Sequence, residues 1–198
     1  VKSYGGGVCH VSTTLYNAVL KSELDVIERH NHSMRVHYVD PGFDAAISDD
    51  SEAGAVDFSF VNACDAPVYI QAEVGYGTVT FRIYGKENRS KDRTIEFQNK
   101  ITSTTDFGRA YTVDSEQDYG TIYEMAGEEG LTAELWKIIY IDGVEDHKEQ
   151  VNTSIYSPTN HTYFVGTKGA TPETESAIRS ACATKSIDKI NAAILSGA

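Results

Sequence analysis

The chain lacks any apolar run of about eighteen residues, the length that a transmembrane helix needs. It shows no secretory signal peptide and begins without a methionine, so we expect a fragment of a longer protein whose targeting and anchoring segments lie elsewhere. Cations are scarce, because 17 Lys and Arg face 29 Asp and Glu, for a net charge of −12. This balance argues against nucleic acid and anionic membrane surfaces as partners, since little is available to neutralise phosphates.

Cysteine is also scarce, and its pattern excludes the commonest zinc signature. Three cysteines are an odd number, so at least one thiol has no disulfide partner within the chain. No second cysteine lies near Cys9, so the CxxC pair of many zinc sites is absent. A zinc ion held by Cys9, two histidines and a carboxylate stays open as an alternative, but no metal or cofactor is the expectation.

The most informative stretch that is present is GGGVCHVSTT, residues 5–14. The glycines run into a segment with the pattern of a helix, which puts Cys9 at or near a helix N-terminus. Free backbone N–H groups and the positive end of the helix dipole favour an anion there, and a thiolate is such an anion. The glycines also let a substrate carbonyl approach the backbone closely. The stretch therefore predicts a nucleophilic thiol; the alternative is a small buried hydrophobe.

Two histidines follow in ERHNHS, residues 28–33. On an extended strand, His30 and His32 point to the same face. A nucleophilic thiol needs a base within hydrogen-bond reach, and a strand returning after the helix can bring an imidazole back to Cys9. Either histidine is a candidate base, with a structural or surface role as the alternative for each.

Alternating apolar residues beyond the first helix predict strands. In the first part of the chain they cover 24–30, 34–39, 55–62, 67–74 and 78–85. The last three are expected to form an antiparallel meander. Further on, Asp142–Gly143 predicts the turn of a long hairpin, and the stretch 172–196 has a helical pattern, with Ser186 beginning a second helix.

These elements predict an α+β fold, in which an antiparallel sheet packs on one main helix and is followed by a mostly β module and a short helical tail. The polar stretch 86–93 is the candidate boundary. The predicted domains are a catalytic domain over 1–87, incomplete at its N-terminus, a β-rich module over 88–170, and a helical tail over 171–198.

Four motifs resemble the VanW family of bacterial cell-envelope proteins, and they occur here in the family's order. They are GGGVCHVSTTLYNAVL (5–20), ERHNHS (28–33), PGFDAA (41–46) and DFSFVNACDAPVYI (57–70). His10 departs from the family, which commonly carries glutamine there. The module after them is similar, more loosely, to the extracellular β-module named for its five glycines, and the resemblance implies binding to cell-wall amino sugars for that part.

The resemblance implies a cysteine-dependent L,D-transpeptidase that forms a thioester on peptidoglycan stem peptides. It makes Cys9 the nucleophile, His30 and His32 the family's paired histidines, and Asp44 the acid of the Gly-x-Asp-Ala motif. Asp44 or Glu28 would orient the imidazole. Candidates for oxyanion stabilisation or substrate positioning are Gly6, Gly7, Ser12, Thr13 and Arg29, the last also a candidate for a salt bridge.

The implied partners are peptidoglycan stem peptides and the glycan, at the cell wall or cell surface of a bacterium, without membrane contact by this fragment. Two other functions stay open. One is a cysteine peptidase or amidase on the same peptides, and the other is a peptidoglycan-binding module without catalysis. The sequence does not decide the oligomeric state.

Overall fold

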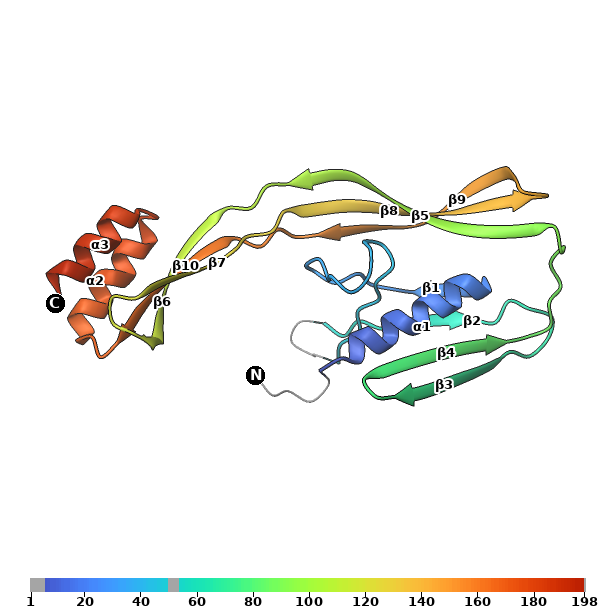
Figure 1. Ribbon diagram of the computed structural model, residues 1–198, viewed down its shortest axis with the longest axis horizontal. Helices are drawn as coiled ribbons and strands as arrows, with labels where there is room; N and C mark the ends of the chain where they lie inside the picture. Colours follow the sequence, from blue (N-terminus) through green and yellow to red (C-terminus); the bar gives the residue numbers. More distant parts are fainter. Residues whose placement is uncertain (1–5, 50–53, 198) are drawn as a thin grey trace. The chain divides into compact units, whose positions relative to one another are not determined.

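The computed structural model describes residues 6–49 and 54–197, so Gly5 of the glycine motif and residues 50–53 lie outside the described part. Contacts divide the chain into two compact units (Figure 1). One unit joins the residues up to Ser103 with Leu131–Tyr156, and the other joins Thr104–Gly130 with the residues from Ser157 onward. The three-part domain division expected from the sequence stays a prediction, because the two compact units do not show which segments fold independently.

The first unit contains helix α1, Val8–Ser22, which has a polar and an apolar side. Gly7 precedes it with φ +96°, a conformation that costs glycine little and other residues more. Glu23 ends it in the left-handed conformation, where its N–H reaches the carbonyls of Val19 and Leu20. The spacing of Tyr16, Val19 and Leu20 places their buried side chains on one side.

Seven strands of the first unit form three separate sheets. The strands are β1 (Asp25–Glu28), β2 (Ser59–Val61), β3 (Tyr69–Gly75), β4 (Thr78–Tyr84), β5 (Arg93–Thr105), β8 (Gly130–Ile141) and β9 (Val144–Tyr156). β1 pairs with β2 and β3 with β4, both antiparallel, and the third sheet has the order β5-β8-β9. The expected turn at Asp142–Gly143 is confirmed, since both residues take positive φ between β8 and β9.

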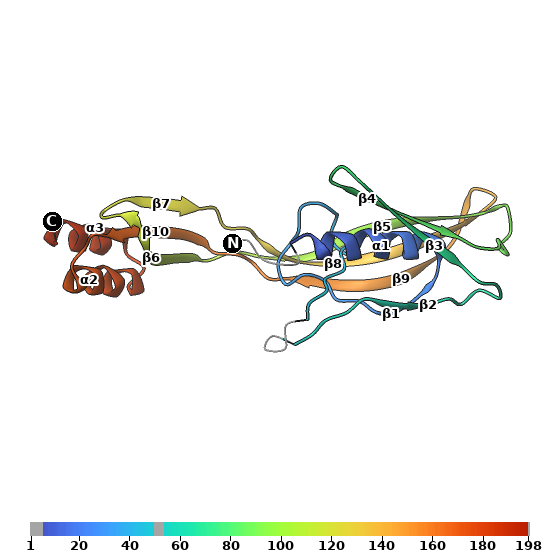
Figure 2. The ribbon, with the colours of Figure 1, turned by 90° about the horizontal axis from the view of Figure 1, so that it is seen from below.

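The core of this unit lies between α1 and the β5-β8-β9 sheet, which run alongside each other in Figures 1 and 2. Tyr16 and Leu20 from α1 pack with Ala45 and with Leu135 of β8. Phe97 of β5 and Val151 of β9 border the same cluster. Burial of these side chains fixes the helix against the sheet.

The second unit has a three-stranded sheet and two helices, which can be followed in Figure 2. Its strands are β6 (Arg109–Asp118), β7 (Ile122–Met125) and β10 (His161–Lys168), in the order β6-β10-β7, and its helices are α2 (Pro172–Ala183) and α3 (Ile187–Ser196). Val165 of β10 packs with Ile178 and Ile190 of the two helices. The predicted helix start at Ser186 is confirmed, because its hydroxyl accepts a hydrogen bond from the Lys189 N–H.

The predicted α+β class is wrong, because the described residues are mostly β. They contain ten strands and three helices, and two of these helices, α2 and α3, lie at the C-terminal end. The expected antiparallel sheet of the N-terminal part is broken. Stretch 34–39 forms no strand, and β2 pairs with β1 rather than with β3. The physical reason at 34–39 is tertiary packing, because the Tyr38 ring contacts the rings of His10 and His32.

Candidate functional site

Cys9 is the second residue of α1 and is half-buried. Its Sγ donates a hydrogen bond of 3.3 Å to the carbonyl of Ile47. The Gly7 carbonyl accepts from the N–H groups of His10 and Val11, as expected for a helix start. The predicted location of the thiol in the first turn is therefore what the structure has, while Gly6 and Gly7 are exposed beside it.

The polar side of α1 binds an extended segment, residues 43–47. Ser12 and Thr13 donate to the carbonyl of Ala45 at 2.5 and 3.3 Å, and the Ala45 N–H donates to Thr13 Oγ1 at 3.0 Å. Asn17 donates to the carbonyl of Phe43 at 2.8 Å. The segment that contacts the Cys9 thiol is therefore held along two turns of the helix. The hydroxyls of Ser12 and Thr13 are used in this contact.

Asp44 lies in the middle of that segment with no solvent exposure. Arg29 donates to its Oδ1 at 2.9 Å and to its carbonyl at 2.6 Å. Tyr156 donates to Oδ1, and the backbone N–H of His32 donates to Oδ2 at 2.7 Å. Burial alone would raise the pKa of Asp44, but the hydrogen bonds from Tyr156 and His32 and the Arg29 charge lower it below the ordinary value. Asp44 is thus held as a carboxylate.

The imidazole of His32 is oriented by this carboxylate. Its Nδ1 lies 2.7 Å from Asp44 Oδ2, and its side chain is 20% exposed. Because an ionised carboxylate only accepts hydrogen bonds, Nδ1 carries the proton and Nε2 is an acceptor in the neutral ring. Nε2 lies 3.5 Å from the hydroxyl of Tyr38. His32 therefore has the partner that a general base needs on one nitrogen, and its other nitrogen faces the Tyr38 hydroxyl.

Tyr38 stands between His32 and the start of α1. Its ring stacks on His10, the neighbour of Cys9, with 4.2 Å between centroids, and meets His32 edge-on at 6.3 Å. Burial raises the pKa of Tyr38, and charge on Cys9 and on Asp44 raises it further. Tyr38 is not among the site residues predicted from the sequence, where it is one tyrosine in a stretch expected to be a strand.

His30 is placed differently from His32. β1 ends at Glu28, so the two histidines do not share a strand face as expected. His30 Nε2 lies 3.2 Å from Glu28 Oε1, and both side chains are 46% exposed. Across the described residues, neither histidine has a hydrogen bond to Cys9. The structure therefore brings together Asp44, Arg29 and His32, and leaves His30 in a surface pair.

Arg29 is enclosed by protein groups. Besides Asp44, it donates to the Ser154 hydroxyl at 2.7 Å, and its guanidinium lies over the Tyr16 ring at 5.4 Å. Ser154 and Tyr156 come from β9, far along the chain, and sequence reasoning missed both. Their alternate positions on a strand indicate a shared face, but no local sequence pattern predicts that this face contacts Asp44 and Arg29.

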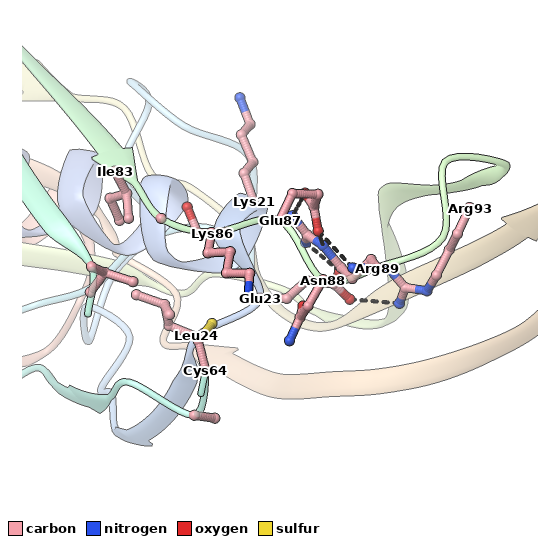
Figure 3. Close-up of a pocket in the computed structure, with 14 residues that line it drawn as sticks. Lys21, Glu23, Leu24, Cys64, Ile83, Lys86, Glu87, Asn88, Arg89 and Arg93 are labelled. Atoms are coloured by element: carbon pink, nitrogen blue, oxygen red, sulfur yellow. Dashed lines mark hydrogen bonds and ion pairs between the residues drawn. The ribbon is translucent and has the colours of Figure 1, made fainter. Parts of the chain in front are cut away.

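A pocket lies at the other end of α1, around Glu23 (Figure 3). Cys64 lines it, and Glu23 binds Arg89 and Arg93 there at 2.6–2.7 Å. The ion pair with Arg93 lowers the pKa of Glu23 to about 2, against the opposing effect of burial. None of the predicted catalytic residues lines this pocket.

Two features are absent from the residues that the structure describes. No group of three or more His, Cys, Asp or Glu side chains in that part is arranged to hold a metal ion, so the four-ligand zinc arrangement does not form there. No helix among the same residues is long and apolar enough to cross a membrane.

Comparison with known proteins gives a family for the N-terminal part. The family model described as VanW like protein matches residues 1–84. The uncharacterized protein YoaR of Bacillus subtilis (strain 168) is 39% identical over 83 residues, which are 42% of this chain and 26% of YoaR. The match thus spans about a quarter of that relative.

Two solved G5 domains also match, each over 38% of this chain. The G5 domain of IgA1 protease is 22% identical, with 93% of it covered and a TM-score of 0.24, and HP0197-G5 is 13% identical, with 100% covered and a TM-score of 0.21.

The VanW match agrees with the resemblance carried by the four motifs and supports a protein of the bacterial cell envelope. Residues 1–84 of this chain are therefore similar to the VanW family.

Proposed function

We propose that this chain is a cysteine-dependent acyltransferase of the bacterial cell envelope, an L,D-transpeptidase that cross-links peptidoglycan stem peptides. The observation that carries the proposal is the contact of Asp44 with His32 Nδ1 beside α1, the helix whose first turn contains Cys9. A buried carboxylate, an imidazole and a thiol are the three parts of a cysteine nucleophile with an oriented base.

In the proposed reaction, His32 Nε2 takes the proton of Cys9, and the thiolate attacks the carbonyl of the third stem residue. The bond to the terminal D-alanine breaks, its amine receives the proton from His32, and a thioester remains. The side-chain amine of a second stem then attacks the thioester, gives its proton to His32 and releases the Cys9 thiol. Because the Tyr38 hydroxyl lies 3.5 Å from His32 Nε2, the Tyr38 ring has to move before Nε2 can take the Cys9 proton. Such a change fits the general behaviour of catalytic hydrogen bonds, which often tighten only with substrate bound.

The backbone N–H groups at the start of α1, after Gly6 and Gly7, are the proposed donors to the oxyanion. The helix has no acidic residue in its first turn to compete for them. Ser12, Thr13 and Arg29 bind protein groups in the structure, which favours a role in holding the segment of Asp44 over direct contact with substrate. Of the two histidines, the contacts favour His32 as base.

One observation favours a second candidate, a wall-binding module without catalysis. The Cys9 thiol already donates to Ile47, which is what a structural cysteine does. In that case the thiol would help hold residues 43–47 on α1, and stem peptides or glycan would bind without reacting.

The experiment that separates these candidates compares wild type with Cys9→Ala and Cys9→Ser on purified muropeptides. The transferase predicts cross-linked products from wild type and at least a ~10³-fold loss in both variants, as for removal of other catalytic nucleophiles. Release of D-alanine without cross-links would show hydrolysis instead. Equal binding to peptidoglycan by all three proteins, with no product from any, would refute the transferase and support the binding module.

A further inference from the structure

Strand β9, which lies outside the VanW match, carries side chains that hold Asp44 and the turn before it. Asn152, Ser154 and Tyr156 occupy alternate positions of this strand, so their side chains point to one face. That face meets residues 42–44 and Arg29. A segment some seventy residues beyond the matched region therefore contributes polar groups to the proposed site.

Tyr156 is the central contact, with 2% of its surface exposed. Its hydroxyl donates to Asp44 Oδ1 and accepts from the Gly42 N–H at 2.8 Å. Burial and the bond to Asp44 raise the pKa of Tyr156 to about 12, so the hydroxyl keeps its proton. It fixes both the backbone before Asp44 and the carboxylate itself.

Ser154 and Asn152 extend this contact. The fully buried Ser154 accepts from Arg29 at 2.7 Å and donates to Asn152 Oδ1 at 3.0 Å. Asn152 donates to the Gly42 carbonyl and to the Tyr16 hydroxyl, both at 2.9 Å. Gly42 has φ +92°, and a Cβ there would approach Leu135 Cβ of β8 to 3.1 Å. The turn before Asp44 is thus seated against both strands of the hairpin.

Both oxygens of Asp44 have donors from different parts of the chain. His32 binds Oδ2, while Arg29 and Tyr156 bind Oδ1. Every fully buried side-chain nitrogen and oxygen among the described residues has a hydrogen-bond partner, so this network is complete there. A carboxylate held on one oxygen by the hairpin presents the other oxygen to His32 in a fixed direction.

We propose that Tyr156 is a positioning residue that acts through Asp44 on the His32 imidazole, and that the β8–β9 hairpin is an integral part of the VanW site. The catalytic meaning of this rests on the proposed function, but the orientation of His32 can be measured without it. A VanW domain that ends with the matched region would then have an incompletely held acid.

The test compares Tyr156→Phe with Tyr140→Phe in the full chain. Tyr140 is a matched control, because it lies on the same hairpin and its hydroxyl binds Glu96 of β5 at 3.3 Å, away from Asp44. Nitrogen-15 NMR of the histidine rings, with His32 assigned by a His32→Gln variant, reports which ring nitrogen carries the proton. We expect a protonated Nδ1 and bare Nε2 in wild type and Tyr140→Phe, and averaged signals in Tyr156→Phe.

Muropeptide turnover is measured on the same proteins. We expect a ~10- to 100-fold loss of kcat in Tyr156→Phe, with KM unchanged, the range seen when groups that orient metal-ligating imidazoles are removed. An altered His32 signature with no turnover from wild type would support the positioning role and refute the proposed function. A folded Tyr156→Phe with the wild-type His32 signature would overturn the positioning role whatever the turnover.

A second variant covers the case in which Tyr156→Phe fails to fold. Ser154→Ala removes the hydroxyl that holds Arg29 and leaves Tyr156 in place. The expected result is a smaller shift of His32 towards averaged signals. An unchanged His32 signature in folded Ser154→Ala would then overturn the proposal.

Discussion

Two carboxylates, one near each end of α1, are each bound by arginine, but in different surroundings. Asp44 is fully buried and binds Arg29, His32 and Tyr156 with defined atoms. Glu23 caps the C-terminal end, is 13% exposed, and binds Arg89, Arg93 and Lys137. Both have a lowered pKa despite the opposing effect of burial. The causes differ: neutral and charged donors hold Asp44, whereas cations dominate at Glu23.

The different surroundings of Glu23 and Asp44 suit the two carboxylates to different roles. Glu23 joins the end of α1 to Arg89 and to Arg93 at the start of β5 (Figure 3), and also to Lys137 of β8. The side chains of these three partners are partly exposed. Salt and solvent screen such a network and weaken it. Asp44 is fully buried, so solvent cannot replace a lost hydrogen-bond partner. Its geometry is therefore fixed and costly to disturb. A fixed geometry is what orientation of an imidazole requires.

The largest effect is expected from Asp44→Asn. The change leaves the buried Arg29 charge without its carboxylate, and breaking a buried pair in this way costs about 3–5 kcal/mol. Urea unfolding at pH 7 measures the loss. Asp25→Asn on β1 is the matched control, because Asp25 is exposed. A loss no greater than that of the control would contradict the contrast between the two carboxylates.

A smaller effect is expected from Glu23→Gln, about 1 kcal/mol at pH 7 and low salt, because partly exposed ion pairs are screened by water. The folded-state pKa of about 2 lies below the ordinary 4.5, so this stabilisation is full above pH 4.5 and is lost as pH falls through about 2. Unfolding curves from pH 7 to 3, at low and at ~1 M salt, measure the difference from wild type. A difference independent of both pH and salt would argue against an electrostatic cause.

The smallest effect is expected from Arg82→Ala on β4. Arg82 binds Glu73 of β3 at 2.5 Å, but the two side chains are 46% and 62% exposed. Pairs of this kind contribute little to stability, so we expect no measurable change in the urea midpoint. A change as large as that of Glu23→Gln would show that exposure does not rank these ion pairs.

Several elements follow from local sequence. Gly7 before Cys9 gives the helix start, Asp142–Gly143 gives the β8–β9 turn, and Ser186 gives the start of α3, because each depends on backbone preferences of a few neighbours. The strand predicted at 34–39 is wrong, because the stretch alternates apolar residues but pairs with no strand among the described residues. Tyr38, within it, became a side chain packed against two imidazoles instead.

The residues alone predict a thiol in the first turn of a helix, followed along the chain by two histidines and an acid. Which histidine contacts Asp44, and which residues hold Asp44 in place, depend on tertiary packing. The reason is distance along the chain, since Tyr156 and Ser154 reach residues 112 and 125 positions away. Contacts of that kind come from packing α1 and residues 42–44 onto a hairpin, and no local preference encodes them.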